Sequence, residues 1–162
     1  MQHKVKYLLQ LIEQLGEHRD MAIQAAQKAQ QDANEHKGAM ESRYDTFKEE
    51  SQYLSAAQQL RTATLEQAIF DTDRLAHSLE GLRHDIVRVG SIVTVRDDDD
   101  IERNYFIVPY SLGIQHLIAG QSTIIIGKDS PIASALLGAS VGDELEVALP
   151  KGLNTYYVVS IG

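Results

Sequence analysis

Four acidic residues flank a short segment that contains Gly38. Asp32 and Glu35 precede the segment, and Glu41 and Asp45 follow it. Carboxylate oxygens are the ligands that hard divalent cations prefer, but acidic side chains are also common near turns and helix starts. Taken from the residues alone, a solvated helix end is the favoured interpretation of these four carboxylates.

Two other groups of residues could hold a metal ion. The acidic run Asp97 to Asp100 joins two predicted strands and lacks the spaced ligands of a calcium loop, so it indicates a solvated hairpin turn. His77, Glu80 and His84 fall at positions i, i+3 and i+7 of one helical face, where a zinc site is conceivable. Polar residues at helical spacing are far commoner on a solvated surface, and we expect no metal or other cofactor of the chain's own.

The sequence excludes several kinds of catalytic site. There is no Cys, hence no disulfide, thiolate metal site or thiol nucleophile. No Ser/His/Asp arrangement can be argued. The segment Gly127 to Ser130 resembles a phosphate-binding loop only faintly, because the preceding glycine is Gly120 and an Asp follows Lys128 where Ser or Thr is needed. A helix cap is the better interpretation of this segment.

The bulk composition is acidic, with 15 Lys+Arg against 23 Asp+Glu and a net charge of -8. Direct binding to a nucleic acid backbone needs a basic face, so a partner with basic surfaces is expected instead. No apolar run approaches the roughly 20 residues that span a bilayer. The segment Met1 to Leu11 lacks the pattern of a signal peptide, which predicts a cytoplasmic protein without membrane contact.

Proline and glycine divide the chain into two halves. All three prolines follow residue 100, and only three of the 11 glycines precede Gly90. Because neither residue suits a helix interior, the first half is free to be helical and turns punctuate the second. We predict a boundary near Asp85 to Val89, with a helical hairpin over residues 1–86 and a β-rich domain over residues 87–162.

The first half predicts two long antiparallel helices that turn between Asn34 and Ser42. The first helix has an unbroken 3-4 spacing typical of helices packed along their length, at Val5, Leu8, Ile12, Leu15, Arg19, Ala22, Ala26, Ala29 and Ala33. The second helix, from about Tyr44 to Leu82, has the expected inward positions Phe47, Leu54, Ala57, Leu65, Ile69, Thr72, Ala76 and Leu79. A helix of about 33 residues is roughly 50 Å long.

The second half predicts about five strands and one short helix, and hence an α+β fold. The expected strands are Ser91 to Arg96, Asn104 to Val108, Thr123 to Ile126, Glu144 to Leu149 and Tyr156 to Ile161. The helix is marked by Ser130 as N-cap, Pro131 at its first position and Gly138 as its end.

Several segments of the second half resemble the C-terminal domain of the Gre family (GreA and GreB). They are Val89-Gly90-Ser91 before Ile92 to Val95, Tyr105 to Val108, Asp129 to Gly138, Val141 to Val147 and Tyr156 to Ile161. The spacing of Ser-Pro-Ile, Ala-Leu-Leu-Gly and Val-Gly-Asp is the specific part of the match. The preceding hairpin fits the architecture of the family.

The resemblance implies an FKBP-like C-terminal domain that docks at the rim of the secondary channel of RNA polymerase. It implies a coiled coil that reaches down the channel, where acidic residues help to hold a magnesium ion and a water at the polymerase active site. The polymerase then cleaves backtracked RNA. The chain itself is then an accessory factor rather than an enzyme. Nucleic acid is contacted only within the polymerase complex.

The candidate residues under this resemblance are Glu35, Glu41 and Asp45, with Asp32 as a further candidate. Asp32-Ala33-Asn34-Glu35 has the family's acidic spacing, but His36-Lys37-Gly38 follows it. Two alternatives stay open. One is a Gre-like regulator that binds RNA polymerase without stimulating cleavage. The other is a coiled-coil adaptor or scaffold, which exposed residues outside the seam, such as Leu9 and Leu11, would favour.

Overall fold

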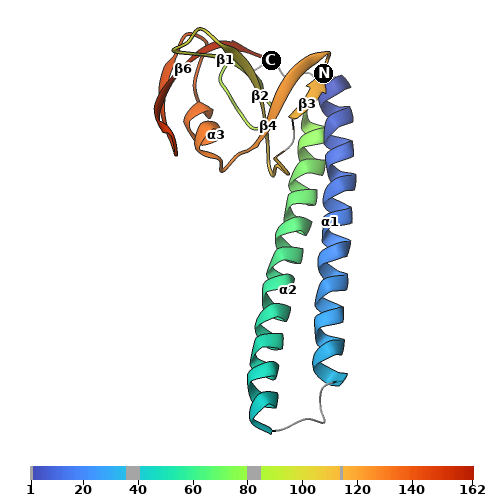
Figure 1. The fold of residues 1–162 in the computed structure, drawn as a ribbon. Helices are drawn as coiled ribbons and strands as arrows, with labels where there is room; N and C mark the ends of the chain where they lie inside the picture. The colour runs from blue at the N-terminus through green and yellow to red at the C-terminus, as the bar shows by residue number, and fades with distance from the viewer. Residues whose placement is uncertain (1, 36–40, 80–84, 114) are drawn as a thin grey trace. The chain divides into compact units, whose positions relative to one another are not determined.

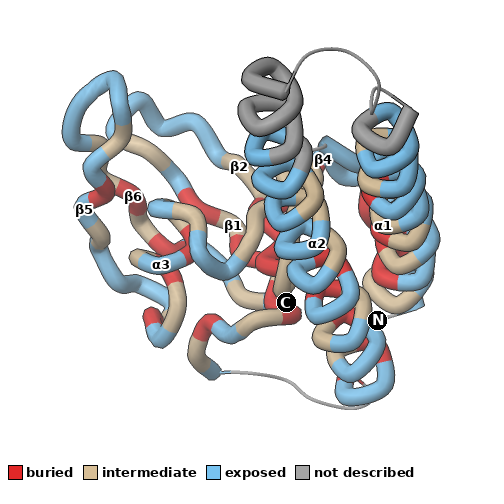
Figure 2. Tube along the Cα trace, turned by 90° about the horizontal axis from the view of Figure 1, so that it is seen from below, coloured by how far each residue is buried: buried red, intermediate tan, exposed pale blue. Residues whose placement is uncertain are grey.

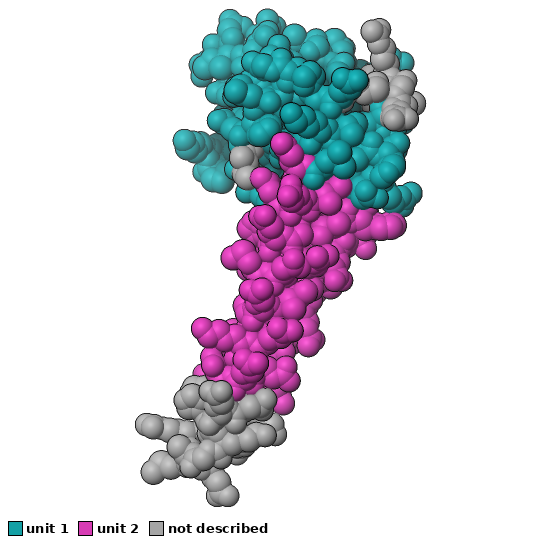
Figure 3. Space-filling view, turned by 90° about the vertical axis from the view of Figure 1, so that its right-hand side faces the viewer, with its two compact units in different colours: residues 1–9, 71–162 teal, residues 10–70 magenta. Residues whose placement is uncertain are grey.

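The computed structural model describes residues 2–35, 41–79, 85–113 and 115–162 (Figure 1). The side chains of residues 33–35, 41–48 and 51 lie outside this description. The described chain forms two compact units (Figure 3): unit 1 contains residues 1–9 and 71–162, and unit 2 contains residues 10–70. The division into 1–86 and 87–162 concerns independent folding and stays a prediction.

Unit 1 is built on one mixed sheet of six strands, which confirms the α+β class. The strands are β1 (Ile92–Asp97), β2 (Glu102–Val108), β3 (Gln115–Ile118), β4 (Gln121–Gly127), β5 (Glu144–Leu149) and β6 (Gly152–Ile161). Their order is β3-β4-β2-β1-β6-β5. Only β2 and β4 pair in parallel, since the other neighbours are antiparallel. The edge strand β3 was not predicted.

The central strand β2 is covered on both faces. Tyr105 and Ile107 belong to the core cluster that includes Ala133 and Leu136 of the helix α3 (Pro131–Leu136). Successive side chains of a strand point to opposite faces, so Phe106 faces away from α3. It is fully buried, and its ring lies edge-on to Tyr7, with the ring centroids 5.8 Å apart. The start of the first helix therefore covers the second face of the sheet within unit 1.

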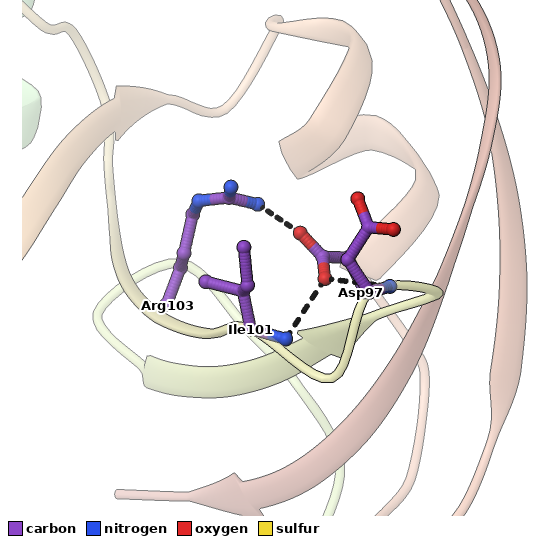
Figure 4. A network of polar contacts seen from close by, with 4 residues as sticks. Asp97, Ile101 and Arg103 are labelled. Carbon is purple, nitrogen blue, oxygen red and sulfur yellow. Dashed lines mark hydrogen bonds and ion pairs between the residues drawn. The ribbon is translucent and has the colours of Figure 1, made fainter.

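Two predicted local structures are confirmed. Ser130 caps α3, because its Oγ accepts a hydrogen bond from the Ala133 N–H at 3.2 Å, and this explains the segment Gly127 to Ser130. The acidic run after β1 is a hairpin turn in which Asp97 accepts hydrogen bonds from the Ile101 N–H at 2.9 Å and from Arg103 (Figure 4). The Ile101 N–H, and then Arg103, hold the pKa of Asp97 below its usual value.

The helix ends are fastened to the sheet of unit 1 by specific contacts. Lys4 Nζ donates hydrogen bonds to the carbonyls of Gly90 at 3.0 Å and Gly162 at 2.7 Å, and burial lowers the pKa of Lys4. Gly90 has φ +98, and a Cβ at this position would lie 2.8 Å from Leu75 Cδ1 and 2.9 Å from Leu79 Cδ2. Only glycine allows both this backbone conformation and this approach.

Unit 2 contains most of two long helices, α1 (Gln2–Glu35) from Gln10 onward and α2 (Glu41–Ser78) as far as Phe70. The two helices lie side by side and run in opposite directions (Figures 1 and 2). The predicted seam of α1 is confirmed, since Leu15 and Ala22 are buried and the members between and after them are half-buried as far as Ala29. Leu11 is buried as well, whereas Leu9 is exposed. The predicted turn lies mostly at residues 36–40, outside the described residues.

The predicted inner face of α2 is right in one part and wrong in another. Leu65 is buried in unit 2, and Thr72, Ala76 and Leu79 are buried in unit 1. Leu54 and Ala57 are exposed, however. Continuing the 3-4 spacing back from Leu65 leads to the half-buried positions Thr62, Gln58 and Ser55. Leu54 and Ala57 are predicted to face inward because they are apolar. The buried and half-buried positions of α2 instead follow one unbroken 3-4 spacing.

Candidate functional site

The four acidic residues lie at the ends of the two long helices that face the connecting segment. Glu35 is the last residue of α1, and Asp32 precedes it by one turn. Glu41 is the first residue of α2, and Asp45 follows one turn later. Because only residues 36–40 connect the two helices, both pairs are held at one end of unit 2. We call this set the acidic end.

The described residues test only part of this prediction. The side chain of Asp32 is exposed. Those of Glu35, Glu41 and Asp45 lie outside the description, so the distances between these carboxylates stay a prediction. The helix bounds alone establish that the residues share one end of a helical pair.

The helix dipole affects the two pairs of carboxylates in opposite ways. A helix has partial negative charge at its C-terminal end, so an acidic residue there costs about 0.3–1 kcal/mol, whereas one at the N-terminal end is stabilised. Asp32 and Glu35 occupy the last turn of α1, which contains no basic residue. Helix stabilisation therefore explains an acidic residue at Glu41 but not at Asp32 or Glu35. The dipole of α1 is therefore unfavourable for the charges of Asp32 and Glu35.

Few side chains are buried in the described stretches of unit 2 that lead to the acidic end. None of the described residues in 23–32 or 52–64 is buried. On α2 the inner positions are Ser55, Gln58 and Thr62. Thr62 Oγ1 donates a hydrogen bond to the backbone carbonyl of Gln58 at 2.9 Å. Sequence reasoning missed this polar inner face, although the 3-4 spacing of α2 would have revealed it.

One buried polar atom stands out in this region. Gln58 Oε1 is buried and has no hydrogen-bond partner among the described residues. Near it, a hollow of about 190 Å³ is lined by Gln30, Gln52, Ser55, Ala56 and Gln59. A buried carbonyl oxygen without a partner costs stability. The described stretches 23–32 and 52–64 therefore depend more on helix stiffness than on buried side chains.

The other candidate metal sites gain no support. His77 Nδ1 lies 2.8 Å from the carbonyl of Asp73, one turn earlier on the same helix. Glu80 and His84 fall outside the described residues. Within residues 2–35, 41–79, 85–113 and 115–162, no three His, Cys, Asp or Glu side chains are grouped to hold a metal ion. The described helices also include none long and apolar enough to cross a membrane.

Comparison with known proteins gives a consistent result. The family model "Transcription elongation factor, GreA/GreB, C-term" matches residues 82–162. Transcription elongation factor GreA of Rickettsia prowazekii is 31% identical over 137 residues, covering 80% of this chain and 74% of the relative. The GreA of Alkaliphilus oremlandii is 34% identical over 121 residues, covering 74% of this chain and 69% of the relative. The crystal structure of Thermus aquaticus Gfh1 is 22% identical and covers 99% of this chain and 95% of that chain, with a TM-score of 0.40.

Proposed function

Because this chain belongs to the Gre family of transcription elongation factors, we propose that it binds RNA polymerase and brings its acidic end into the secondary channel. The observation that carries the proposal is the family match of residues 82–162. The helical pair that precedes this region supports it, because α1 and α2 are about 51 and 57 Å long at 1.5 Å per residue and can extend into a channel. The matched region is the part that we expect to dock at the channel rim.

We further propose that the acidic end stimulates cleavage of backtracked RNA. Magnesium takes oxygen ligands and commonly only one or two carboxylates, so the chemistry of Glu35, Glu41 and Asp45 suits an ion whose other ligands belong to the polymerase. That ion supplies charge stabilisation at the phosphate and activates a water. The carboxylates of this chain orient the water and accept its hydrogen bonds. Asp32 is a further candidate for the same role.

The acidic residues in the last turn of α1 support this assignment. They lie where the helix dipole disfavours them, and a role toward a cation accounts for that placement. A metal ion in the partner would offset the unfavourable interaction with the dipole on binding. The free protein would then keep these carboxylates at a small cost to its own stability.

A second candidate function is a regulator that occupies the channel without stimulating cleavage. The observation that favours it is His36-Lys37-Gly38 directly after Glu35. Lys37 puts a positive charge two residues after Glu35 in the sequence, and like charge disfavours a nearby metal ion. Both versions require polymerase binding and differ only in whether the bound chain stimulates RNA cleavage.

The partner is tested by adding the full chain to purified core RNA polymerase and following co-elution in gel filtration. We expect a stable complex. We also expect complex formation by a variant with Ala at Asp32, Glu35, Glu41 and Asp45, because the matched region is proposed to dock. If the folded chain, checked by circular dichroism, elutes apart from the polymerase, both versions fail and a coiled-coil adaptor without polymerase contact takes their place.

A further inference from the structure

The outward side of α2 carries a second apolar stripe that the helical pair does not use. Tyr53, Ala56, Leu60 and Ala63 follow one another at 3-4-3 spacing, and all four are exposed. Tyr53 is 78% exposed and Leu60 is 71% exposed. Large apolar side chains at regular helical spacing on a surface mark an interaction site more often than scattered ones do. We call these four residues the outer stripe.

In the same stretch of α2, polar residues occupy the inner positions and apolar residues lie on the outward side. Between residues 53 and 63 the inner positions are Ser55, Gln58 and Thr62, which are polar and half-buried. An ordinary amphipathic helix puts its apolar residues inward. Here Tyr53 and Leu60 point away from the inner positions, and even the amide oxygen of Gln58 is buried without a partner among the described residues. The apolar residues of this stretch therefore serve something other than the pairing of α1 with α2.

The spacing of the outer stripe identifies the shape of its partner. A stripe at 3-4 spacing fits the corresponding stripe of another α-helix, because their side chains interlock. Next to the stripe, a hollow of about 510 Å³ is lined by Glu49, Glu50, Tyr53 and Leu54. Carboxylates beside apolar walls accommodate a Lys or Arg, whose stem packs on the apolar groups while its head meets the charge.

The charges that flank the stripe identify the chemistry of the partner. In a helix pair, the side chains beside the stripe decide which partner is accepted. In the described part of unit 2 these flanking positions are acidic or neutral: Glu50, Gln52, Ala57, Gln59, Thr64 and Glu66. A second copy of this chain would bring the same acidic or neutral positions together and would gain no charge attraction. Glu50 and Glu66 would attract a partner helix that carries Lys or Arg beside its own apolar stripe.

We propose that the outer stripe docks on an α-helix of RNA polymerase that carries apolar residues at the same spacing, flanked by Lys or Arg. This inference rests on the proposed function. The stripe follows Glu41 on the same helix at about 18–33 Å, at 1.5 Å per residue. A partner that encloses α2 over this length would therefore meet the outer stripe as well as the acidic end.

The test measures the affinity of the labelled full chain for core RNA polymerase by fluorescence anisotropy. Leu60→Glu places a charge in the stripe, and Met21→Glu is the matched control, since Met21 is 66% exposed on α1 and lies outside the stripe. We expect at least tenfold weaker binding for Leu60→Glu and less than a twofold change for Met21→Glu. Both variants should keep the helix content of the wild type in circular dichroism.

A second pair of variants tests the charge. Glu50→Lys should weaken binding several-fold at low salt and less at high salt, because exposed charges are screened. Glu17→Lys, an exposed position on α1, is its control. If Leu60→Glu binds as tightly as the wild type, the stripe is not a docking surface, although polymerase binding stands. If the wild type does not bind polymerase, the proposed function fails together with this inference. If the wild type sediments as a dimer that Leu60→Glu dissociates, the occupant is a second copy and the proposal is overturned.

Discussion

The two units of the molecule are stabilised in different ways. Unit 1 buries apolar side chains on both faces of its sheet, from the six strands, α3 and the helix ends. The buried residues described in unit 2 are fewer, and all belong to its parts that adjoin unit 1 in the sequence: Leu11, Leu15, Ala22, Leu65 and Ala68. Side-chain packing therefore holds unit 1 together, whereas the described stretches of unit 2 after Ala22 and before Leu65 depend mainly on helix stiffness.

This contrast separates stability from the proposed activity. Helices without tertiary packing are marginally stable and fray locally. Substitutions in the sheet should therefore unfold unit 1, while substitutions at the acidic end should leave the free energy of unfolding nearly unchanged. Four sets of variants test this contrast by their effect on stability.

Phe106→Ala should have the largest effect, because Phe106 is fully buried between the sheet and Tyr7. Removing a buried aromatic ring costs about 3–5 kcal/mol. Leu60→Ala, at an exposed position of unit 2, should change the free energy of unfolding by less than about 0.5 kcal/mol. Both values come from urea denaturation followed by circular dichroism. Equal losses for the two variants would remove the distinction between the units.

Gly90→Ala should destabilise unit 1 through two separate effects, which a second glycine can separate. Gly142 also has positive φ, but a Cβ there would meet nothing within 4 Å. Gly142→Ala should therefore cost about 1 kcal/mol for backbone strain alone. Gly90→Ala should cost about 1–3 kcal/mol more, because its Cβ presses on Leu75 and Leu79. Similar costs in thermal or urea unfolding would mean that the helix end is not tightly seated on the sheet.

Gln58→Leu should stabilise unit 2 by about 1 kcal/mol, because it removes a buried oxygen that lacks a partner among the described residues. Gln59→Leu, at the neighbouring exposed position, is the control and should have little effect. Hydrogen exchange of the α2 amides, measured by mass spectrometry, should slow in Gln58→Leu only. Faster exchange would indicate that the Gln58 amide has a stabilising contact after all.

Tyr7→Phe should have almost no effect at neutral pH and a specific effect in alkali. Burial raises the pKa of Tyr7 to about 12, whereas an unfolded chain has a Tyr pKa of about 10. Because the folded pKa is the higher one, the contribution of Tyr7 is fully present below pH of about 10 and is lost as the pH rises toward about 12. In Tyr7→Phe the free energy of unfolding should fall less over this range. An identical pH profile would show that the hydroxyl is not desolvated.

The sequence predicted the elements whose local signals agree with their packing. Ser130, Pro131 and Gly138 mark α3 by capping chemistry alone, and the 3-4 spacing of α1 coincides with its buried side. Two elements could not be predicted in this way. The edge strand β3 has four residues, of which three are exposed. Its sequence therefore shows no alternation of apolar and polar residues that would predict a strand. The register of α2 near Gln58 conflicts with hydrophobicity, because the apolar side chains there face outward.

The candidate site could be predicted only as a set of residue types at one end of the hairpin. Helix bounds agree with that placement for Asp32, Glu35, Glu41 and Asp45. The roles proposed for them depend on a metal ion and a water held by another protein. The positions of that metal ion and water cannot be derived from the sequence of this chain alone. The polar inner face of α2 was missed because it is visible only once the register is extended from Leu65.

RNA cleavage in stalled, backtracked elongation complexes with magnesium present measures whether the acidic end stimulates the polymerase. The wild-type chain should shorten the transcript from its 3′ end. Ala at Glu35, Glu41, Asp45 or Asp32 should slow this reaction, by about a hundredfold at a position that acts on the water, without weakening polymerase binding. Glu17→Ala, an exposed acidic position on α1, should cleave at the wild-type rate. A chain that binds the polymerase and never shortens the transcript would contradict the cleavage account and establish the regulator instead.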